Sequence, residues 1–249
     1  MSNKTSSKTT FNRENRDVII ACDFYSTTEL FSFLENFKGE ERPYLKIGMQ
    51  LFYAAGLSLV HKLKNDDYKI FLDLKLHDIP NTVKNAMAVL SDANVDMVNV
   101  HASGGSRMMK AALEGIREGK NDRDTVTKLI AVTQLTSTSQ EDMNFDLGLP
   151  GKVEDVVLKY ALNAKNAGLD GVVCSPHEAS KMHEKLGSDF LTVTPGIRFD
   201  NSVSDDQRRI MTPLEAGKAG SDYIVVGRPI TKSSNPLSAY RKCIEDFLL

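Results

Sequence analysis

The chain has 249 residues, of which 41% are hydrophobic and 26% are charged, and its formal net charge is −2. These values are typical of a globular protein with one large core. The charge is nearly balanced, and the sequence has no densely basic run of the kind that binds nucleic acid. It also has no apolar run long enough to span a membrane. We therefore expect neither nucleic acid nor a membrane as a partner.

Residues 1–15 are polar and rich in Ser and Thr, without the apolar centre of a secretory signal. We expect a disordered tail there and a single folded domain over residues 16–249. A mitochondrial-type presequence is the weaker alternative, because the segment has no clear amphipathic pattern. The three cysteines are widely spaced and form no CxxC pair, which indicates reduced thiols in a cytoplasmic protein.

Short apolar runs alternate with amphipathic segments along the rest of the chain. The predicted strands are 17–23, 44–48, 69–75, 97–101, 128–135, 171–175, 190–195 and 222–227. The predicted helices are 28–37, 50–64, 82–93, 106–118, 153–167, 177–186, 213–219 and 236–248. Continuous Val, Ile and Leu runs are typical of parallel strands that are covered on both faces. Eight strands alternating with eight helices favour an α/β fold, a single-domain (β/α)8 TIM barrel, over an open doubly wound sheet.

Polar residues gather where these strands end, which is where such barrels carry their chemistry. In the third strand, Asp73 and Lys75 are two residues apart, so an extended strand would point both side chains to one face. Lys46, on the preceding strand, should be their lateral neighbour. The structural alternative is a buried ion pair that only sets register. Because buried pairs are poor stabilisers, these charges indicate a functional site.

A lysine held between carboxylates should stay protonated, because nearby negative charge favours the ammonium form. This predicts a proton donor and argues against a Schiff base, which requires a neutral amine. The sequence shows no motif for a thiamine or pyridoxal cofactor and no dense set of His or Cys metal ligands. We therefore expect an enzyme without a cofactor or metal.

A phosphate site is predicted at the ends of the last two strands, where this fold commonly holds one. TPGIR (194–198) is followed by the polar stretch 199–211, which we expect to be a mobile lid. In the last strand, Gly227 would let the backbone approach an anion, Arg228 would supply several donors, and Pro229 could start a short helix. The alternative is a plain turn with a surface arginine. The presence of Arg198 and Gln207 nearby favours the phosphate site over this alternative.

Five segments, in this order along the chain, resemble monofunctional bacterial orotidine 5'-phosphate decarboxylases. They are DLKLHDIPNT (73–82), VTQLTST (132–138), VTPGIR (193–198), DDQRRIMTP (205–213) and YIVVGRPIT (223–231). The resemblance covers residues 17–247 and implies a barrel that converts orotidine 5'-phosphate to uridine 5'-phosphate and CO2 in pyrimidine biosynthesis. The polar N-terminal segment is the one visible departure from the family.

The resemblance also implies roles for individual residues. Lys75 would protonate C6 of the pyrimidine, with Asp73, Lys46 and Asp78 as the other charged catalytic residues. Asp78, Ile79 and Thr82 would reach into the partner's site of a homodimer. Asp23 would bind the ribose hydroxyls and Thr136 the pyrimidine edge. The remaining substrate and phosphate contacts would be Pro195, Arg198, Gln207, Gly227 and Arg228.

Three other functions remain as alternatives. A Mg²⁺-dependent sugar-phosphate decarboxylase or hexulose-phosphate synthase shares the Asp-x-Lys-x-x-Asp strand, but the Thr136 segment and the Arg198–Gln207 region favour a pyrimidine nucleotide. A Schiff-base aldolase would use a neutral lysine. A non-catalytic nucleotide-binding barrel would have no need of Lys46, Asp73, Lys75 and Asp78.

Overall fold

The computed structural model describes residues 16–119, 127–199 and 210–249. Its strands are β1 (Asp17–Ala21), β2 (Tyr44–Gly48), β3 (Ile70–Leu76), β4 (Met97–His101), β5 (Lys128–Val132), β6 (Gly171–Val173), β7 (Leu191–Thr194) and β8 (Tyr223–Val226). All eight predicted strands are present, and the differences from prediction are confined to their ends. Two predicted features lie outside the described residues: the N-terminal tail, and residues 200–209 of the lid, which include Gln207.

The α-helices alternate with the strands. They are α1 (Thr27–Leu34), α2 (Met49–Asn65), α3 (Pro80–Asp92), α4 (Gly105–Glu118), α5 (Val153–Ala167), α6 (Ala179–Leu186), α7 (Pro213–Lys218), α8 (Arg228–Thr231) and α9 (Pro236–Leu248). Short helical turns η2 (Glu35–Phe37), η3 (Ala102–Gly104), η4 (Asp142–Asp146) and η5 (Pro176–Glu178) complete the order. The short helix predicted at Pro229 is α8, whose first turn contains that proline.

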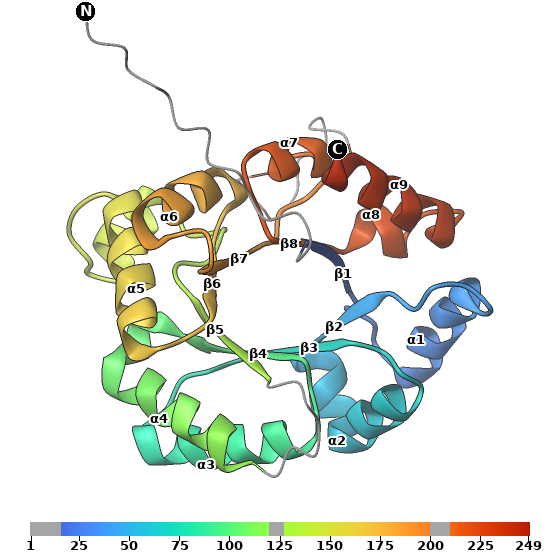
Figure 1. Cartoon of the computed structure of the whole chain (residues 1–249), viewed down its shortest axis with the longest axis horizontal. Coiled ribbons are helices and arrows are strands. Elements are labelled where there is room, and N and C mark those ends of the chain that lie inside the picture. Colours follow the sequence, from blue (N-terminus) through green and yellow to red (C-terminus); the bar gives the residue numbers. More distant parts are fainter. Residues whose placement is uncertain (1–15, 120–126, 200–209) are drawn as a thin grey trace, which may run out of the picture.

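The strands form a closed barrel in sequence order, β1 to β8. Closure is direct, because β1 pairs in parallel with both β2 and β8. Figure 1 shows the helices as a ring around the strands, with β8 returning beside β1. The predicted (β/α)8 barrel is therefore confirmed over the open sheet.

Apolar side chains pack in two layers. The larger core lies between strands and helices and includes Ile20, Leu72 and Val98. A smaller cluster fills the barrel interior and includes Tyr44, Phe71 and Met97. Because side chains alternate along a strand, the residues that follow these three by two positions point into the same interior. Those residues are Lys46, Asp73 and Asn99. The barrel interior therefore has an apolar layer and, next to it toward the carboxyl ends of the strands, a polar layer.

The predicted placement of Asp73 and Lys75 on one face agrees with the 2.7 Å contact between their side chains, but the pairing of β3 with β4 is irregular at the carboxyl end of β3. Leu72 pairs with Val98 and Leu76 with Val100, so β3 has four steps where β4 has two. Lys75 lies within this bulge and has a φ of 53°. The extra residues bend β3, as bulges do, and re-aim the side chains at the mouth of the barrel.

Carboxylates close the opposite, amino-terminal end. Asp96, Asp170 and Asp222 each precede an even-numbered strand, and each accepts a backbone N–H from the odd-numbered strand before it. The donors are Ile70, Leu129 and Thr192, each at 2.7 Å from the carboxylate oxygen. These bonds satisfy strand-end N–H groups that would otherwise lack a ladder partner.

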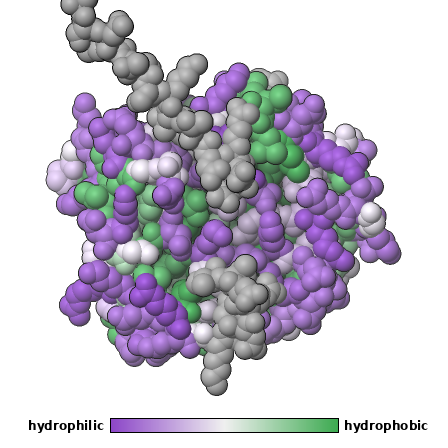
Figure 2. Space-filling view, viewed as in Figure 1, coloured by the Kyte–Doolittle hydropathy of each residue, from purple (hydrophilic) through white to green (hydrophobic). Residues whose placement is uncertain are grey.

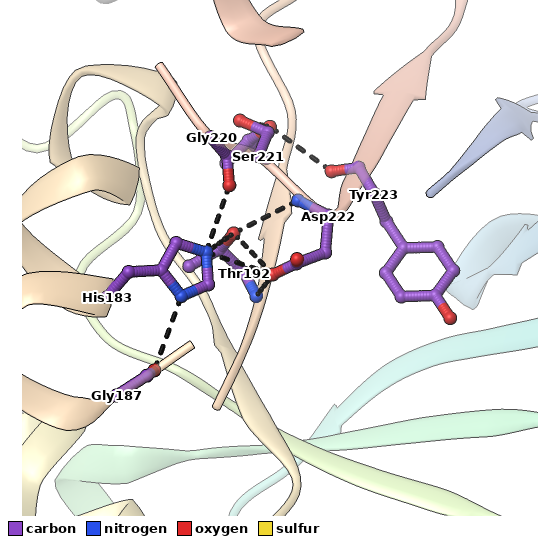
Figure 3. A network of polar contacts seen from close by, with 8 residues as sticks. His183, Gly187, Thr192, Gly220, Ser221, Asp222 and Tyr223 are labelled. Carbon is purple, nitrogen blue, oxygen red and sulfur yellow. Dashed lines mark hydrogen bonds and ion pairs between the residues drawn. The ribbon is translucent and has the colours of Figure 1, made fainter. Parts of the chain in front are cut away.

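The Asp222 carboxylate also belongs to a buried network around His183 of α6 (Figure 3). His183 Nε2 lies 3.2 Å from Asp222 Oδ2 and 2.9 Å from the Gly220 carbonyl, and Nδ1 lies 3.4 Å from the Gly187 carbonyl. Since both ring nitrogens face acceptors, the geometry favours the doubly protonated imidazolium. The network ties α6 to the starts of β7 and β8.

The face viewed along the barrel axis is largely hydrophilic, with hydrophobic residues gathered in separate patches (Figure 2). Exposed large hydrophobic side chains include Tyr25, Tyr53, Ile79 and Phe145. Within the described parts of the chain, no helix has the length and apolar character needed to cross a membrane.

Candidate active site

Four charged side chains form an alternating row at the carboxyl ends of β1, β2 and β3. Lys75 Nζ lies 2.7 Å from Asp73 Oδ1, and Lys46 Nζ lies 3.5 Å from Asp73 Oδ2. Lys46 Nζ also lies 3.0 Å from Asp23 Oδ1. The row Asp23–Lys46–Asp73–Lys75 therefore alternates in sign, and the predicted lateral contact between Lys46 and Asp73 is present.

Exposure is lowest in the middle of the row. The side chains of Lys46 and Asp73 retain only 10% and 12% of their accessible surface, whereas Lys75 at one end retains 25% and Asp23 at the other retains 64%. The Lys75 ammonium is thus fixed on one side by Asp73 and open on another. A charged donor in this position can contact a ligand in the barrel mouth.

The electrostatics of the row keep its inner members charged. Burial alone would raise the pKa of Asp73, but the Lys46 and Lys75 ammonium groups bring that pKa below its ordinary value. Burial would lower the pKa of Lys46, but Asp73 and Asp23 bring it above its ordinary value. Each group is ionised at neutral pH, as expected for paired buried charges.

Two further polar residues of β4 line this region. Asn99 is 1% exposed, and its side chain bonds to both Asp73 and Lys75. His101, two residues later, packs against His77 with ring centroids 5.9 Å apart. Burial, together with His77 and Lys75, lowers the pKa of His101 and so favours its neutral form. Our sequence reasoning missed Asn99, although it shares the inward face of Met97 and His101.

Asp78 and Ile79 lie in the exposed turn between β3 and α3, and Thr82 is exposed in the first turn of α3. Ile79 is 67% exposed, and Asp78 Oδ1 accepts the backbone N–H of Ile79 at 2.6 Å. Among the described residues, Asp78 forms no ion pair with Lys75. The single chain therefore brings Lys46, Asp73 and Lys75 together and leaves the Asp78 turn facing outward.

Pro195, Arg198, Gly227 and Arg228 lie after β7 and β8, as predicted. The Arg198 N–H donates to Met211 O at 3.0 Å, and the Met211 N–H donates to Gly196 O at 3.1 Å. These bonds hold the two ends of the 199–211 stretch together. At Gly227, an added methyl would meet, among the described residues, only Ala21, at ordinary contact distance. Packing against the described residues therefore does not require glycine at that position.

Thr136 is half-buried in the loop after β5 and lines a cavity of about 540 Å³ that extends toward α5 and α6.

The Asp73 carboxylate is already bonded to two ammonium groups and one amide within the chain. In the described part of the chain, no three His, Cys, Asp or Glu side chains gather as a metal site.

Comparisons with known proteins agree over nearly the whole chain. The sequence profile of the orotidine 5'-phosphate decarboxylase / HUMPS family matches residues 16–243. A Bacillus cytotoxicus protein named orotidine 5'-phosphate decarboxylase is 53% identical over 91% of this chain and 95% of its own. The crystal structure of orotidine 5'-phosphate decarboxylase from Lactobacillus acidophilus superimposes with a TM-score of 0.85 at 43% identity, over 93% of this chain and 99% of that one. A structure of an uncharacterized conserved protein from Geobacillus kaustophilus gives a TM-score of 0.83, also at 43% identity, over 92% and 99%.

Proposed function

The chain belongs to the orotidine 5'-phosphate decarboxylase / HUMPS family, and from this premise we propose that Lys75 is the residue that protonates the reacting carbon. The protein is a carbon–carbon lyase that converts orotidine 5'-phosphate to uridine 5'-phosphate and CO2 in pyrimidine biosynthesis. The observation that carries the role of Lys75 is the alternating row in which its ammonium group is held by Asp73 at 2.7 Å and in which Lys75 is the more exposed of the two lysines.

In the proposed reaction, the bond between pyrimidine C6 and the carboxylate breaks, and its electron pair stays on C6 as CO2 leaves. The Lys75 ammonium faces this developing negative charge and then transfers a proton to C6. The resulting amine recovers a proton from solvent. Asp73 keeps the ammonium in place, and Lys46 keeps Asp73 ionised by raising the cost of protonating it.

The charges act before the reaction begins, because they are already arranged by the fold. Donors and charges that need no reorganisation stabilise a transition state better than mobile ones. Asp73 would also lie beside the substrate carboxylate and disfavour the ground state. The alternating row thus supplies an electrostatic environment in place of an electron-accepting cofactor.

Binding of the remaining parts of the substrate is proposed as follows. Asp23 contacts the ribose hydroxyls and Thr136 the pyrimidine edge. The phosphate lies beside Pro195, Arg198, Gly227 and Arg228. Gln207, which lies outside the described residues, is proposed as a further contact. The glycine at 227 supports this phosphate position, because the described residues leave space beside it for a ligand. Phosphate contacts remote from C6 contribute binding energy that can be used at the reacting end.

We further propose a homodimer in which Asp78, Ile79 and Thr82 of one subunit complete the site of the other. Their exposure supports this, since an isoleucine that is 67% exposed gains from being covered. We also assign the protein to the cytoplasm. Its three cysteines are buried and form no disulfide, which suits a reducing compartment.

The central test is the ultraviolet change of orotidine 5'-phosphate on mixing with purified protein. The Lys75→Ala variant should lose about 10³-fold or more in turnover, because a positioned proton donor and its charge are removed together. Circular dichroism should show an intact fold. Near-normal turnover in this variant would refute the role of Lys75.

The alternatives are separated by two simple treatments. Excess EDTA should leave turnover intact, whereas a Mg²⁺-dependent sugar-phosphate enzyme would stop. Borohydride added with substrate should leave the mass of the protein unchanged, whereas a Schiff-base enzyme would gain a covalent adduct. A non-catalytic nucleotide-binding barrel would bind orotidine 5'-phosphate without consuming it.

The dimer is tested by mixing two inactive variants, Lys75→Ala and Asp78→Ala, and refolding them together. A mixed dimer would contain one site with both native residues. Random pairing should then restore up to about a quarter of wild-type activity, since half the dimers are mixed and each has one intact site. If both residues act within one subunit, mixing restores nothing.

A further inference from the structure

Lys75 has an unusual backbone for its residue type and position. Among the described residues other than glycine, only Asp67, Lys75 and Asn94 have a positive φ. Asp67 and Asn94 lie in turns that follow α2 and α3, and Asp and Asn tolerate this conformation. Lys75 lies within a strand and has a long side chain. Such a backbone persists only where surrounding contacts impose it.

The contact that meets the Lys75 backbone comes from Asn99 of β4. The Lys75 N–H donates to Asn99 Oδ1 at 2.8 Å. The bulge in β3 displaces this N–H from the regular register with β4, and the side-chain oxygen supplies its acceptor. Without that oxygen, a partly buried donor would be left unpaired, which is unfavourable.

The other end of the same amide meets the carboxylate beside Lys75. Asn99 Nδ2 donates to Asp73 Oδ1 at 2.7 Å, and the same oxygen accepts from Lys75 Nζ. A flipped amide would place oxygen against carboxylate and nitrogen against N–H, so the orientation is set by both partners. Asn99 thus fixes the backbone of residue 75 and the carboxylate that holds its ammonium group.

We propose that Asn99 is a positioning residue that aims the Lys75 ammonium at the reacting carbon. It acts through Lys75 and Asp73 and does not contact the substrate, and the proposal rests on the role given to Lys75 above. Asn99 is 1% exposed, and its side chain contacts Lys75 and Asp73. The other charged or titratable groups nearby are Lys46, which is paired with Asp73, and His101 with its neighbour His77.

Asn99→Ala removes both bonds and frees Lys75 to shift. We expect kcat to fall about 10- to 100-fold, since small misplacements of reacting groups have effects of that size, while KM changes little. Ser91→Ala is the matched control: Ser91 is also 1% exposed and bonds a backbone carbonyl, Ile116 O at 3.0 Å, far from the charged row. Its kcat per folded molecule should equal that of the wild type.

Asn99→Asp gives a readout that a packing role would not produce. The acceptor for the Lys75 N–H is retained, but a carboxyl oxygen now lies about where Nδ2 lay, beside Asp73 Oδ1. Two carboxyl groups this close share a proton, which raises the pKa of one of them. Turnover should approach wild type while that proton is bound and fall as pH rises, adding an alkaline limb to the kcat profile that Asn99→Ala lacks.

The proposal is overturned if Asn99→Ala keeps wild-type kcat, if Ser91→Ala loses as much, or if Asn99→Asp and Asn99→Ala have the same pH profile. Lys75→Ala is measured in parallel. An inactive Lys75→Ala beside a fully active Asn99→Ala refutes only the positioning role. An active Lys75→Ala refutes the proposed role of Lys75 itself.

Discussion

The two ends of the barrel each carry a cluster of buried charge, and the clusters differ in what their donors face. At the amino-terminal end, both nitrogens of His183 face protein acceptors, and the side chain is 1% exposed. At the carboxyl end, Lys75 is bound by Asp73 on one side and retains 25% of its side-chain surface. One cluster is closed on itself, and the other keeps a donor available for a ligand.

A structural cluster of buried charges can therefore be distinguished from a catalytic one by whether its donors are all satisfied within the protein. Buried ionic groups contribute little net stability unless every hydrogen-bonding position is satisfied. The His183 cluster meets that condition with backbone carbonyls and Asp222. In the Asp23–Lys46–Asp73–Lys75 row, Lys46 lies between two carboxylates, whereas Lys75 is paired with Asp73 and keeps exposed surface, an arrangement better suited to contacting an anionic transition state than to stability.

Of the changes that compare the two ends, the largest effect should follow from neutralising the Asp73 carboxylate at the carboxyl end. In Asp73→Asn, Lys75 loses the charge that fixes it, and turnover should fall about 10²- to 10³-fold, the scale seen when one preorganised electrostatic group is removed. Steady-state decay of orotidine 5'-phosphate absorbance measures it. Unchanged turnover would mean that the charged row does not serve catalysis.

The matching change at the other end should affect stability instead. Asp222→Ala removes the acceptor of the Thr192 N–H, the Thr192 hydroxyl and His183. The free energy of unfolding should fall by about 3–5 kcal/mol, because a buried imidazolium is left unpaired. Urea titration gives this value, and kcat of the folded protein should not change. A loss of kcat would break the distinction between the two ends.

The pH dependence of stability should identify His183. Burial lowers the pKa of His183, but the hydrogen bond and charge of Asp222 raise it above its ordinary value of 6.5. Its stabilisation is therefore complete below about 6.5 and is lost as pH rises through the higher folded-state pKa. Urea unfolding between pH 6 and 9 should show this loss in the wild type. The His183→Gln variant serves as the reference and should lack that component.

The smallest effect is expected for a neutral bond near the same end. Thr194 Oγ1 donates to Ser221 Oγ at 2.9 Å, and both residues are fully buried. Ser221→Ala should lower the free energy of unfolding by about 1 kcal/mol, the usual contribution of one neutral hydrogen bond. Thermal and urea unfolding can resolve this change. A loss as large as that of Asp222→Ala would show that charge is not what distinguishes the network.

Much of the architecture could be predicted from the sequence because its signals are local. Helix α5 has the predicted bounds 153–167, set by apolar spacing and by Gly168, which adopts the left-handed conformation at its end. The convergence of Lys46 and Asp73 was also predictable, since inward positions on adjacent parallel strands are neighbours by geometry. The roles of Asp78 and Gln207 depend on a partner subunit or on residues outside the described ranges, and they stay predictions.

The sequence by itself determined the alternation of strands and helices, and it placed charged residues at the strand ends. Only the tertiary structure decided that the barrel closes, that β3 bulges at Lys75, and that Asn99 and His183 find their partners. The physical reason is range. Periodicity and turn signals act within a few residues, whereas a bulge, a buried amide and an imidazolium are stabilised by atoms that lie 24 to 39 positions away in the chain, as in Lys75–Asn99 and His183–Asp222.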